Sequence, residues 1–387
     1  MRPRHVITAL ALLFFLAPLG LRAVGVTARP FENRPMAPKP SPHAGWDVFD
    51  QTTRFFTDRM PLREQAVRAQ TWAARHVLDV PPRWRRDLLA GQANTAALPQ
   101  DKQLAPVKVV EDPAAASGSR VVEGKQGWLF LEDDLQRACS PALGWPLLVD
   151  RLERLAQGIR SSGRDVVVAI APDKSTIYPE LVGDRGRQRY PCAEANRRAY
   201  WPLMERSAEP GLLPLRQALL DAKGADELYR STDSHWNTLG GSVAVRAILD
   251  RLDAGVRVAP GEIVTRPPLK YTGDLNTLLG IAETSTTPDR AVVRRPGAPK
   301  LGGETLFISD SYGLHNAPLL VPYAEKLTQL QWPIATPDAM IAAVERADHV
   351  IIQIIEREVP LQFLDTSRFA LLLRAVEAGL KPRSAPG

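Results

Sequence analysis

From Val121 onward, the chain alternates short apolar runs with longer amphipathic segments, and this alternation limits the folds that it can adopt. The composition of buried strands is found in three segments: Val166–Ala171, Thr305–Ser309 and Val350–Ile355. Helical periodicity is found in four others: Trp145–Ile159, Thr238–Leu252, Pro337–Ala347 and Leu361–Ala378. Strands that alternate with helices in this way predict an α/β fold, with a parallel sheet and helices on both faces.

The ends of the expected strands indicate where a site would lie. Ligands of open parallel sheets bind outside the carboxyl ends of the strands. Pro172, Ser311 and Glu356 fall at the ends of the three expected strands. We therefore expect these three positions to share one crevice.

The N-terminal segment, residues 1–28, has the features of a signal peptide or a membrane anchor. Arg2 and Arg4 precede an apolar run from Val6 to Leu21, whose 16 residues fall between a signal-peptide core and a membrane span of about 20 residues. Val26–Ala28 offers a cleavage site of small residues, so removal and retention both stay open. In either case we expect a periplasmic or extracytoplasmic protein, secreted or anchored to the cell membrane.

The rest of the chain divides into three parts by composition. Residues 29–45 are rich in proline and predict an extended linker. Residues 46–118 predict an N-terminal helical arm, with two helices between Trp46 and Val80 divided by Pro61, followed by an irregular segment. Residues 119–387 predict the α/β domain, which starts with a short β-hairpin around Gly127.

The net charge and the cysteine content limit the kinds of partner and site that the chain can have. The net charge of +6 over 387 residues comes mostly from scattered arginines, which favours solvated surface residues over a face for an anionic polysaccharide or membrane. Nothing resembles a nucleic-acid-binding module. Cys139 and Cys192 are the only cysteines; outside the cytoplasm we expect them to form a disulfide, with two buried free thiols as the alternative. No cluster has metal-ligand spacing.

Ser311, His235 and Asp233 are the candidate catalytic residues. A serine hydroxyl is a weak nucleophile until a base takes its proton, and that base needs a carboxylate to orient it. Asp233 and His235 are two residues apart, so one loop can direct both toward a common centre. Ser311 follows an expected strand and precedes a helix, where free backbone N–H groups can stabilise an oxyanion.

Each assignment has an alternative. Ser311 also suits a helix N-cap, and Asp233 suits a turn or capping role before Thr238. His315 is a rival base, but no acid lies near it in sequence, which favours a supporting or surface position. Asp310 is a rival acid; because adjacent side chains at a strand end point apart, we expect it to brace the loop.

Several motifs occur in one order along the chain: Gly124–Phe130, Pro172–Pro179, Asp233–Asn237, Thr272–Leu275 and Asp310–Tyr312. In this order they resemble the SGNH-hydrolase-like proteins of the alginate O-acetyltransferase type, AlgJ and AlgX. The resemblance extends from about Trp46 to the C-terminus. Ser309 departs from it, because the family usually has glycine there, and we recognise no appended carbohydrate-binding domain of the AlgX type.

The resemblance implies an SGNH-hydrolase-like, flavodoxin-like fold and an exported O-acetyltransferase. Acetyl would pass through Ser311, His235 and Asp233 onto hydroxyls of a polysaccharide acceptor, an exopolysaccharide or cell-wall polymer. An integral membrane acyltransferase would be the partner that supplies acetyl, and no metal or organic cofactor is expected. Two other functions stay open: an acetylesterase with the same triad, and a non-catalytic scaffold of a polysaccharide export complex.

Five further residues are candidates for the oxyanion hole or for substrate binding. Asn237 and Tyr312 would supplement the backbone N–H of Ser311, although Asn237 can also close a turn and Tyr312 can simply pack. Lys174 follows a strand end and would line the site. Arg357 belongs to a Glu-Arg pair that resembles one in the family, with a structural ion pair as the alternative. Trp236 would stack on a sugar ring or anchor its loop.

Overall fold

The computed structural model describes residues 121–381 except 225, 253, 365 and 366, together with residues 47–62 and scattered positions between 17 and 72. These residues fall into two compact units. One contains α2 (Asp47–Asp58) and α11 (Asp274–Leu278), and the other contains the chain from Val121 to Gly273 and from Thr284 onward. Helix α2 lies within the first helix expected after Trp46.

The predicted signal or anchor segment, the linker and the irregular segment lie outside the described residues, apart from isolated positions. No helix among the residues that the structure describes is long and apolar enough to span a bilayer.

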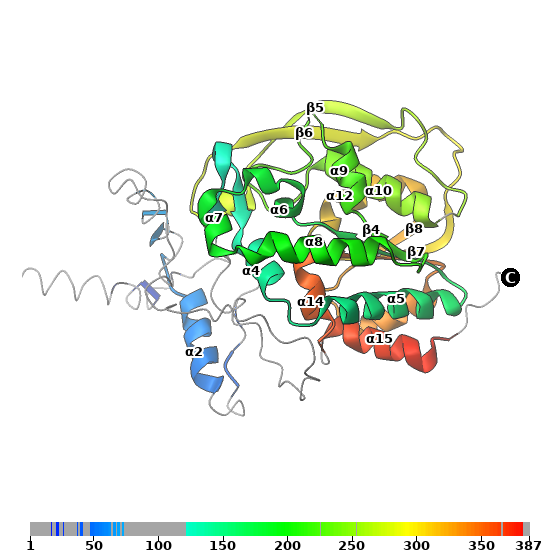
Figure 1. Cartoon of the computed structure of the whole chain (residues 1–387), viewed down its shortest axis with the longest axis horizontal. Coiled ribbons are helices and arrows are strands. Elements are labelled where there is room, and N and C mark those ends of the chain that lie inside the picture. The colour runs from blue at the N-terminus through cyan, green and yellow to red at the C-terminus, as the bar shows by residue number, and fades with distance from the viewer. Residues whose placement is uncertain are drawn as a thin grey trace, which may run out of the picture. The chain divides into compact units, whose positions relative to one another are not determined.

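A five-stranded parallel sheet forms the centre of the larger unit (Figure 1). Its strands lie in the order β4-β3-β9-β7-β8, with parallel pairing throughout. Their bounds are β3 (Asp165–Ala171), β4 (Leu212–Pro214), β7 (Leu301–Ser309), β8 (Ala324–Gln331) and β9 (His349–Ile355). The predicted α/β class is confirmed.

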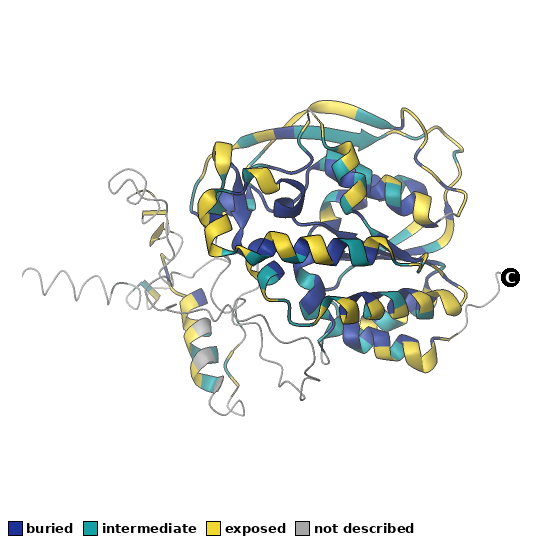
Figure 2. Cartoon of the chain, viewed as in Figure 1, coloured by how far each residue is buried: buried dark blue, intermediate teal, exposed yellow. Residues whose placement is uncertain are grey.

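Helices cover both faces of this sheet because successive strand residues point to opposite sides. In β3, Val167 and Ala169 pack with one set of helices, whereas Val166 and Val168 pack with the other. The first set is α9 (Arg216–Ala222), α10 (Thr238–Leu252) and α12 (Gly313–Leu320). The second set is α5 (Trp145–Ser161), α8 (Cys192–Glu205), α13 (Pro337–Arg346) and α15 (Arg368–Gly379). Figure 2 shows the resulting buried sheet between helices with exposed outer surfaces.

Shorter elements surround the sheet. The hairpin expected around Gly127 is present as β1 (Val121–Glu123) paired with β2 (Leu129–Leu131). A second, longer hairpin consists of β5 (Ile263–Tyr271) and β6 (Ser285–Val292). The remaining short helices are α4 (Glu132–Cys139), α6 (Lys174–Ile177), α7 (Asp184–Arg189) and α14 (Val359–Gln362), with 3-10 turns at Lys125–Gly127, Pro179–Leu181, Val321–Tyr323 and Glu356–Glu358.

One expected helix is divided. The pattern from Leu361 to Ala378 predicts a single helix, but α14 ends at Gln362 and α15 begins at Arg368. Ser367 interrupts the helix because its side chain accepts a hydrogen bond from the N–H of Ala370, which makes it the N-cap of α15.

Candidate active site

Asp233, His235 and Ser311 form a continuous hydrogen-bonded chain. Oδ1 of Asp233 lies 2.7 Å from Nδ1 of His235, and Nε2 of His235 lies 2.8 Å from Oγ of Ser311. Asp233 and His235 are buried, whereas Ser311 is partly exposed. The arrangement has the geometry in which an imidazole takes a proton from a serine and a carboxylate orients the imidazole.

A tight loop presents Asp233 and His235. Tyr229 and Trp236 pair as an antiparallel bridge, and the N–H of Arg230 donates to the carbonyl of His235 across the loop. The same Oδ1 of Asp233 that contacts the imidazole also accepts the backbone N–H of His235 at 2.9 Å. The loop therefore fixes the carboxylate and the imidazole together.

The side chain of Lys174 supports this loop from the protein interior. Its Nζ donates to the carbonyls of Arg230 at 3.1 Å, Ser231 at 3.2 Å and Asp233 at 2.6 Å. The side chain is fully buried. Lys174 therefore orients the loop from within the protein, in contrast to the site-lining position expected from the sequence.

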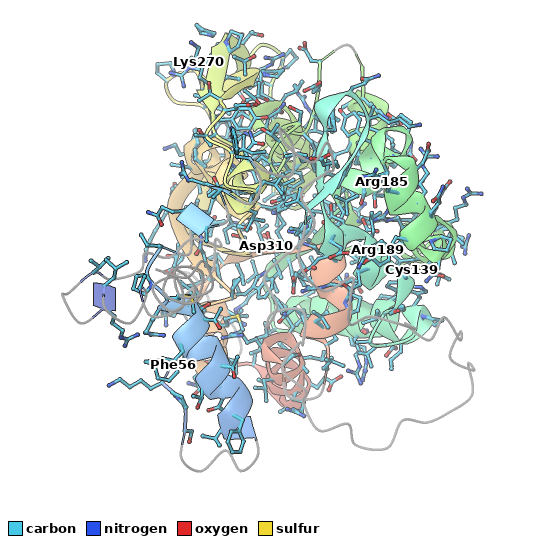
Figure 3. All side chains as sticks on the ribbon, turned by 90° about the vertical axis from the view of Figure 1, so that its left-hand side faces the viewer. Phe56, Cys139, Arg185, Arg189, Lys270 and Asp310 are labelled. Carbon is cyan, nitrogen blue, oxygen red and sulfur yellow. A yellow bond between two sulfur atoms is a disulfide. The ribbon has the colours of Figure 1, made fainter. Side chains whose placement is uncertain are left out.

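A sharp turn presents Ser311 between β7 and α12. The carboxylate of Asp310 accepts the N–H of Tyr312 at 2.9 Å and that of Ile355 in β9 at 2.7 Å, and Figure 3 places Asp310 inside the domain. This is the bracing role predicted for Asp310. Gly313 allows the turn to close, because a Cβ at that position would lie 2.1 Å from Oγ of Ser309.

Two hydrogen bonds join the loop of His235 to the turn of Ser311. The indole N–H of Trp236 donates to the carbonyl of Tyr312 at 3.2 Å, and the hydroxyl of Tyr312 donates to the carbonyl of Ser234. Burial raises the pKa of Tyr312 well above its usual value, so this hydroxyl keeps its proton. Both aromatic side chains are fully buried; of the two roles open for Trp236, the structure favours the loop anchor.

Asn237 occupies the start of α10. Its Oδ1 accepts the N–H groups of Leu239 and Gly240, while its Nδ2 donates to the carbonyl of Glu227 and to Oγ1 of Thr287. Both protons of the amide are used, so Asn237 has no free donor for an oxyanion and acts as the N-cap of the helix. Among the described residues, by contrast, no acceptor bonds the backbone N–H of Ser311.

The environment of Asp233 favours its ionised form. Burial by itself would raise the pKa of Asp233, but the hydrogen bond and charge of the His235 ring and the N–H of His235 lower it below its usual range, with a smaller contribution from Arg230. A buried carboxylate that stays ionised can stabilise an imidazolium as it forms.

Arg357 lies behind the turn in a buried ion pair. Its Nη1 donates to Oδ1 of Asp173 at 2.6 Å and to Oδ1 of Asp134 at 3.3 Å, and the guanidinium lies 5.4 Å from the ring centre of Tyr312. Of the two roles left open, the structure favours the ion pair, although its partners are these two aspartates and not the adjacent Glu356.

Glu356 accepts four hydrogen bonds. They come from the N–H of Asp173 at 2.9 Å, Oγ1 of Thr176 at 2.6 Å, Nε of Arg197 at 3.3 Å and the indole of Trp201 at 3.1 Å. This carboxylate therefore ties the ends of β3 and β9 to α8. As expected, three neighbouring strands are followed by Pro172, Ser311 and Glu356. Glu356, however, supports the site from the protein interior and does not line it.

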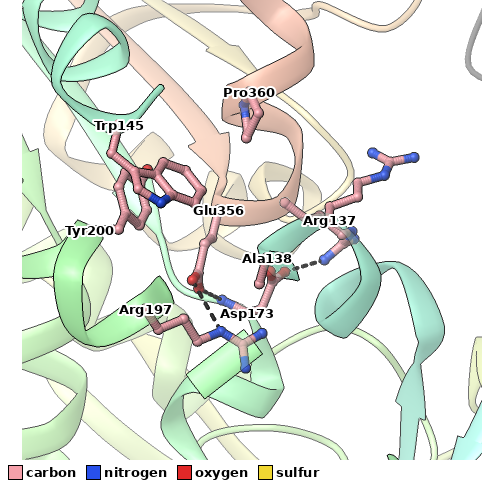
Figure 4. A pocket seen from close by; sticks show the side chains of 9 residues that line it. Arg137, Ala138, Trp145, Asp173, Arg197, Tyr200, Glu356 and Pro360 are labelled. Carbon is pink, nitrogen blue, oxygen red and sulfur yellow. Dashed lines mark hydrogen bonds and ion pairs between the residues drawn. The ribbon is translucent and has the colours of Figure 1, made fainter. Parts of the chain in front are cut away.

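A small pocket lies over these charged groups and does not include the triad (Figure 4). Arg197, Glu356 and Asp173 form its floor, and Trp145 and Tyr200 stand beside it. Burial raises the pKa of Asp173 well above its usual value, and nearby acids add to the shift while Arg357 opposes it. Arg357 thus opposes the protonation that burial favours in this cluster.

The disulfide expected between Cys139 and Cys192 is present and joins the end of α4 to the start of α8. Figure 3 labels Cys139 at this junction. The bond closes a loop of 53 residues, for which the chain-entropy model gives a stabilisation of about 4 kcal/mol. It holds α8, and with it Arg197, against the charged cluster.

Two further residues lie beside the triad: Arg230, which the sequence did not indicate, and His315, which it offered as a rival base or a supporting residue. Arg230 is buried in the same loop as Asp233. The ring of His315 is tilted against that of His235, with ring centres 4.7 Å apart. Burial, together with the charges of His235 and Arg230, lowers the pKa of His315 to about 3. The position of Arg230 three residues before Asp233 places it near the triad but does not indicate that it is buried.

The Asp310→Asn variant is expected to change how stability depends on pH. Burial raises the pKa of Asp310 from 3.8 to about 6 in the folded protein. The folded state then binds the proton more tightly than the unfolded state, so this group lowers stability as pH rises through that interval. We expect wild type to lose about 3 kcal/mol of unfolding free energy relative to Asp310→Asn between about pH 4 and pH 7.

Urea unfolding of both proteins across this pH range measures the difference. Asparagine cannot replace every hydrogen bond of Asp310, and this loss changes the unfolding free energy by an amount that does not vary with pH. The test is therefore how the difference in unfolding free energy between the two proteins changes with pH. Asp150→Asn, on the exposed surface of α5, is the matched control. Parallel pH curves for wild type and Asp310→Asn would contradict the expected shift.

The fold and the Ser-His-Asp geometry of this unit are of the kind expected for an SGNH-hydrolase-like domain. Residues 121–308 match the family model described as the SGNH hydrolase-like domain of acetyltransferase AlgX. In this region the chain is similar to proteins of the AlgJ/AlgX type. The match includes Asp233 and His235 and ends shortly before Ser311.

Curated relatives are named Probable alginate O-acetylase AlgJ. That of Pseudomonas syringae pv. tomato DC3000 is 29% identical over 169 residues, covering 41% of this chain and 41% of the relative. That of Pseudomonas aeruginosa PAO1 is 28% identical over 142 residues, covering 35% and 33%. The chain thus matches about two fifths or less of the length of these relatives.

Two solved structures are also similar to the chain. The O-acetyltransferase domain of Pseudomonas putida AlgJ has 18% identity and a TM-score of 0.43, covering 66% of this chain and 99% of that domain. Pseudomonas aeruginosa AlgX has 14% identity and a TM-score of 0.45, covering 68% of each chain.

Proposed function

We propose that this protein is an O-acetyltransferase that acts on a polysaccharide and uses Ser311 as its nucleophile. The observation that carries the proposal is the unbroken hydrogen-bond chain from Asp233 through His235 to Ser311. Similarity to proteins named alginate O-acetylase supports acetyl transfer to a polysaccharide.

The first half of the reaction acetylates the enzyme. Oγ of Ser311 attacks the carbonyl carbon of the donor acetyl group while Nε2 of His235 takes its proton. The N–H of Ser311, which bonds no acceptor among the described residues, donates to the oxygen that becomes negatively charged. When the tetrahedral species collapses, the leaving group receives the proton from His235 and acetyl remains on Ser311.

The second half passes acetyl to the acceptor. A sugar hydroxyl gives its proton to Nε2 of His235 as its oxygen attacks the acetyl carbon. Collapse releases Ser311, which recovers the proton, and leaves an acetylated sugar. Asp233 stays ionised throughout and stabilises the imidazolium in each half.

We further propose that this reaction takes place outside the cytoplasm. The basic and apolar N-terminal segment of residues 1–28 supports export, as a cleaved signal or a retained anchor. Acetyl would then have to cross the membrane, and an integral membrane acyltransferase is the class of partner that could deliver it.

Incubation of the protein with a chromogenic acetyl ester and an oligosaccharide tests the function. We expect mass spectrometry to detect acetyl esters on the sugar when folded wild-type protein is present. Acetate released to water with a range of acceptors unmodified would contradict transfer and indicate an esterase. A folded protein that neither releases nor transfers acetyl would instead favour a scaffold.

A further inference from the structure

The ring of His235 is in contact with two rings from the segment that follows the nucleophile. Its centre lies 4.8 Å from that of Tyr312 and 4.7 Å from that of His315, and the planes are inclined by 47° and 55°. Rings at such separations attract each other in tilted arrangements. The base of the triad is therefore held by ring contacts as well as by its hydrogen bonds.

The ring of His315 is carried by a helix that is tied to the sheet. The N–H of His315 donates to the carbonyl of Tyr312 at 3.1 Å at the start of α12. The next residue, Asn316, is buried, and its amide donates to Oε1 of Gln353 in β9 at 2.7 Å. This bond holds α12 in place beside His315, so the ring that contacts His235 has a fixed support.

Contact with a ring is the interaction that the structure shows for the side chain of His315. Neither of its nitrogens bonds a group in the described part of the chain, and neither is closed off from solvent. Burial and the charges of His235 and Arg230 lower the pKa of His315 to about 3, although Asp233 opposes the shift. The ring is therefore neutral while His235 becomes an imidazolium, and two like charges do not face each other.

These contacts gain importance once Ser311 carries an acetyl group. Before that step, His235 has hydrogen bonds to Asp233 at 2.7 Å and to Ser311 at 2.8 Å. Esterification of Oγ removes the second bond, because the ester oxygen has no proton to donate. The triad bond that remains fixes Nδ1 but lets the ring turn about the line from Nδ1 to the carboxylate. A turned ring would not present Nε2 to the acceptor hydroxyl.

On the basis of the proposed function, we propose that His315 is a positioning residue for His235. Its ring, together with that of Tyr312, keeps the plane of the catalytic imidazole fixed through both halves of the reaction. The role requires a planar, neutral ring at position 315 and no hydrogen bond from its nitrogens. It gives a use to a histidine beside the triad that takes no proton in the mechanism.

Three substitutions separate the ring of His315 from its nitrogens. His315→Ala removes the ring, and His315→Gln keeps a hydrogen-bonding group without a ring. His315→Phe keeps a ring without the nitrogens, and the access of both nitrogens to solvent leaves room for it. Val321→Ala, at an exposed position just after the same helix, is the matched control.

Rapid mixing with a chromogenic acetyl ester and an oligosaccharide measures both halves of the reaction. The first turnover gives the acetylation rate constant and the dissociation constant of the ester, and later turnovers give the rate constant for acetyl transfer. In His315→Ala and His315→Gln we expect acetylation to slow about 10-fold and transfer about 100-fold, as for a misplaced catalytic group. The dissociation constant of the ester should change by less than about threefold, because binding does not depend on the imidazole plane. His315→Phe and Val321→Ala should behave like wild type.

Proton NMR gives a second measurement that needs no substrate. The proton on Nδ1 of His235 lies in the 2.7 Å bond to Asp233, and a ring that tips exposes this proton to water. We expect its exchange with water to be about 10-fold faster in His315→Ala and His315→Gln, and unchanged in His315→Phe.

Wild-type transfer and proton exchange in His315→Ala would overturn the role of the ring. A loss in His315→Phe as large as that in His315→Ala would also overturn it, because the nitrogens would then be the groups that matter. If His315→Phe does not fold, wild-type behaviour of His315→Gln has the same force. Failure of the proposed function is a different result: wild-type protein would form no acetyl-enzyme, and proton exchange would still decide whether the ring of His315 positions His235.

Discussion

Replacing Ser311 with alanine is expected to lower the turnover of a chromogenic acetyl ester by about 10³- to 10⁶-fold. Oγ of Ser311 lies 2.8 Å from Nε2 of His235, so the variant loses the nucleophile and leaves the base with no proton to accept. The turnover that remains in the variant comes from hydrogen bonds around the reacting centre. Steady-state kinetics on matched protein preparations measure the loss.

His235→Ala should have an effect of similar size, and the double variant should be no slower than either single one, because the residues act as a unit. Ser161→Ala, at an exposed position on α5, should retain the wild-type rate. A Ser311→Ala protein with wild-type turnover would show that another residue is the nucleophile.

Arg357→Met is expected to lower the free energy of unfolding by about 3–5 kcal/mol. The guanidinium is the cation shared by Asp173 and Asp134, both of which are buried. Methionine fills part of the space but leaves two carboxylates facing each other without that charge. Chemical denaturation measures the change in unfolding free energy. It is done at about pH 8, where the unpaired carboxylates destabilise the fold most.

A second substitution separates charge from packing. Asp173→Asn added to Arg357→Met removes one of the stranded carboxylates and should recover part of the lost stability. Arg198→Gln, whose ion pair lies on the surface, should change it by less than about 1 kcal/mol. A loss of that small size in Arg357→Met would mean that the buried pair does not support the fold.

Local pattern was enough to predict the elements that form the centre of the fold. The expected helix Thr238–Leu252 coincides with α10, and the expected strands at Val166 and Val350 start one residue after β3 and β9 begin. These strands are buried on both faces and therefore have continuous apolar sequences. Edge strand β8 is only partly buried and mixes polar with apolar residues. It therefore has no continuous apolar sequence from which a strand could be predicted.

The candidate site was predictable where short spacing decides geometry. Asp233 and His235 share one loop, and Ser311 follows a strand of the sheet, so each part could be recognised from the sequence. Their meeting depends on contacts between the loop and the turn, such as that of Trp236 with Tyr312. The sequence could not distinguish residues that face the site from those beneath it. Lys174 and Arg357 both follow strand ends, yet each is turned inward by carbonyls or carboxylates contributed by distant segments.

The contacts that support the site, as distinct from the residues that the sequence named, link positions over long separations. Arg197 reaches Ser175 and Glu356, and Glu356 reaches Asp173 across 183 positions. No periodicity connects such positions, because the contacts exist only after α8 packs on the sheet. Arg230 was missed for another reason: an isolated arginine in a sequence gives no indication that it will be buried.

Peptide mapping of the acetylated protein tests the central claim most directly. Wild-type protein is mixed with a chromogenic acetyl ester in the absence of acceptor, quenched with acid, digested and analysed by mass spectrometry. The account predicts acetyl on Ser311, its disappearance when an accepting oligosaccharide is added before the quench, and no such adduct in Ser311→Ala. Rapid ester turnover in which rapid-quench samples carry no acetyl on Ser311 at any time, or carry it on another side chain, would contradict it.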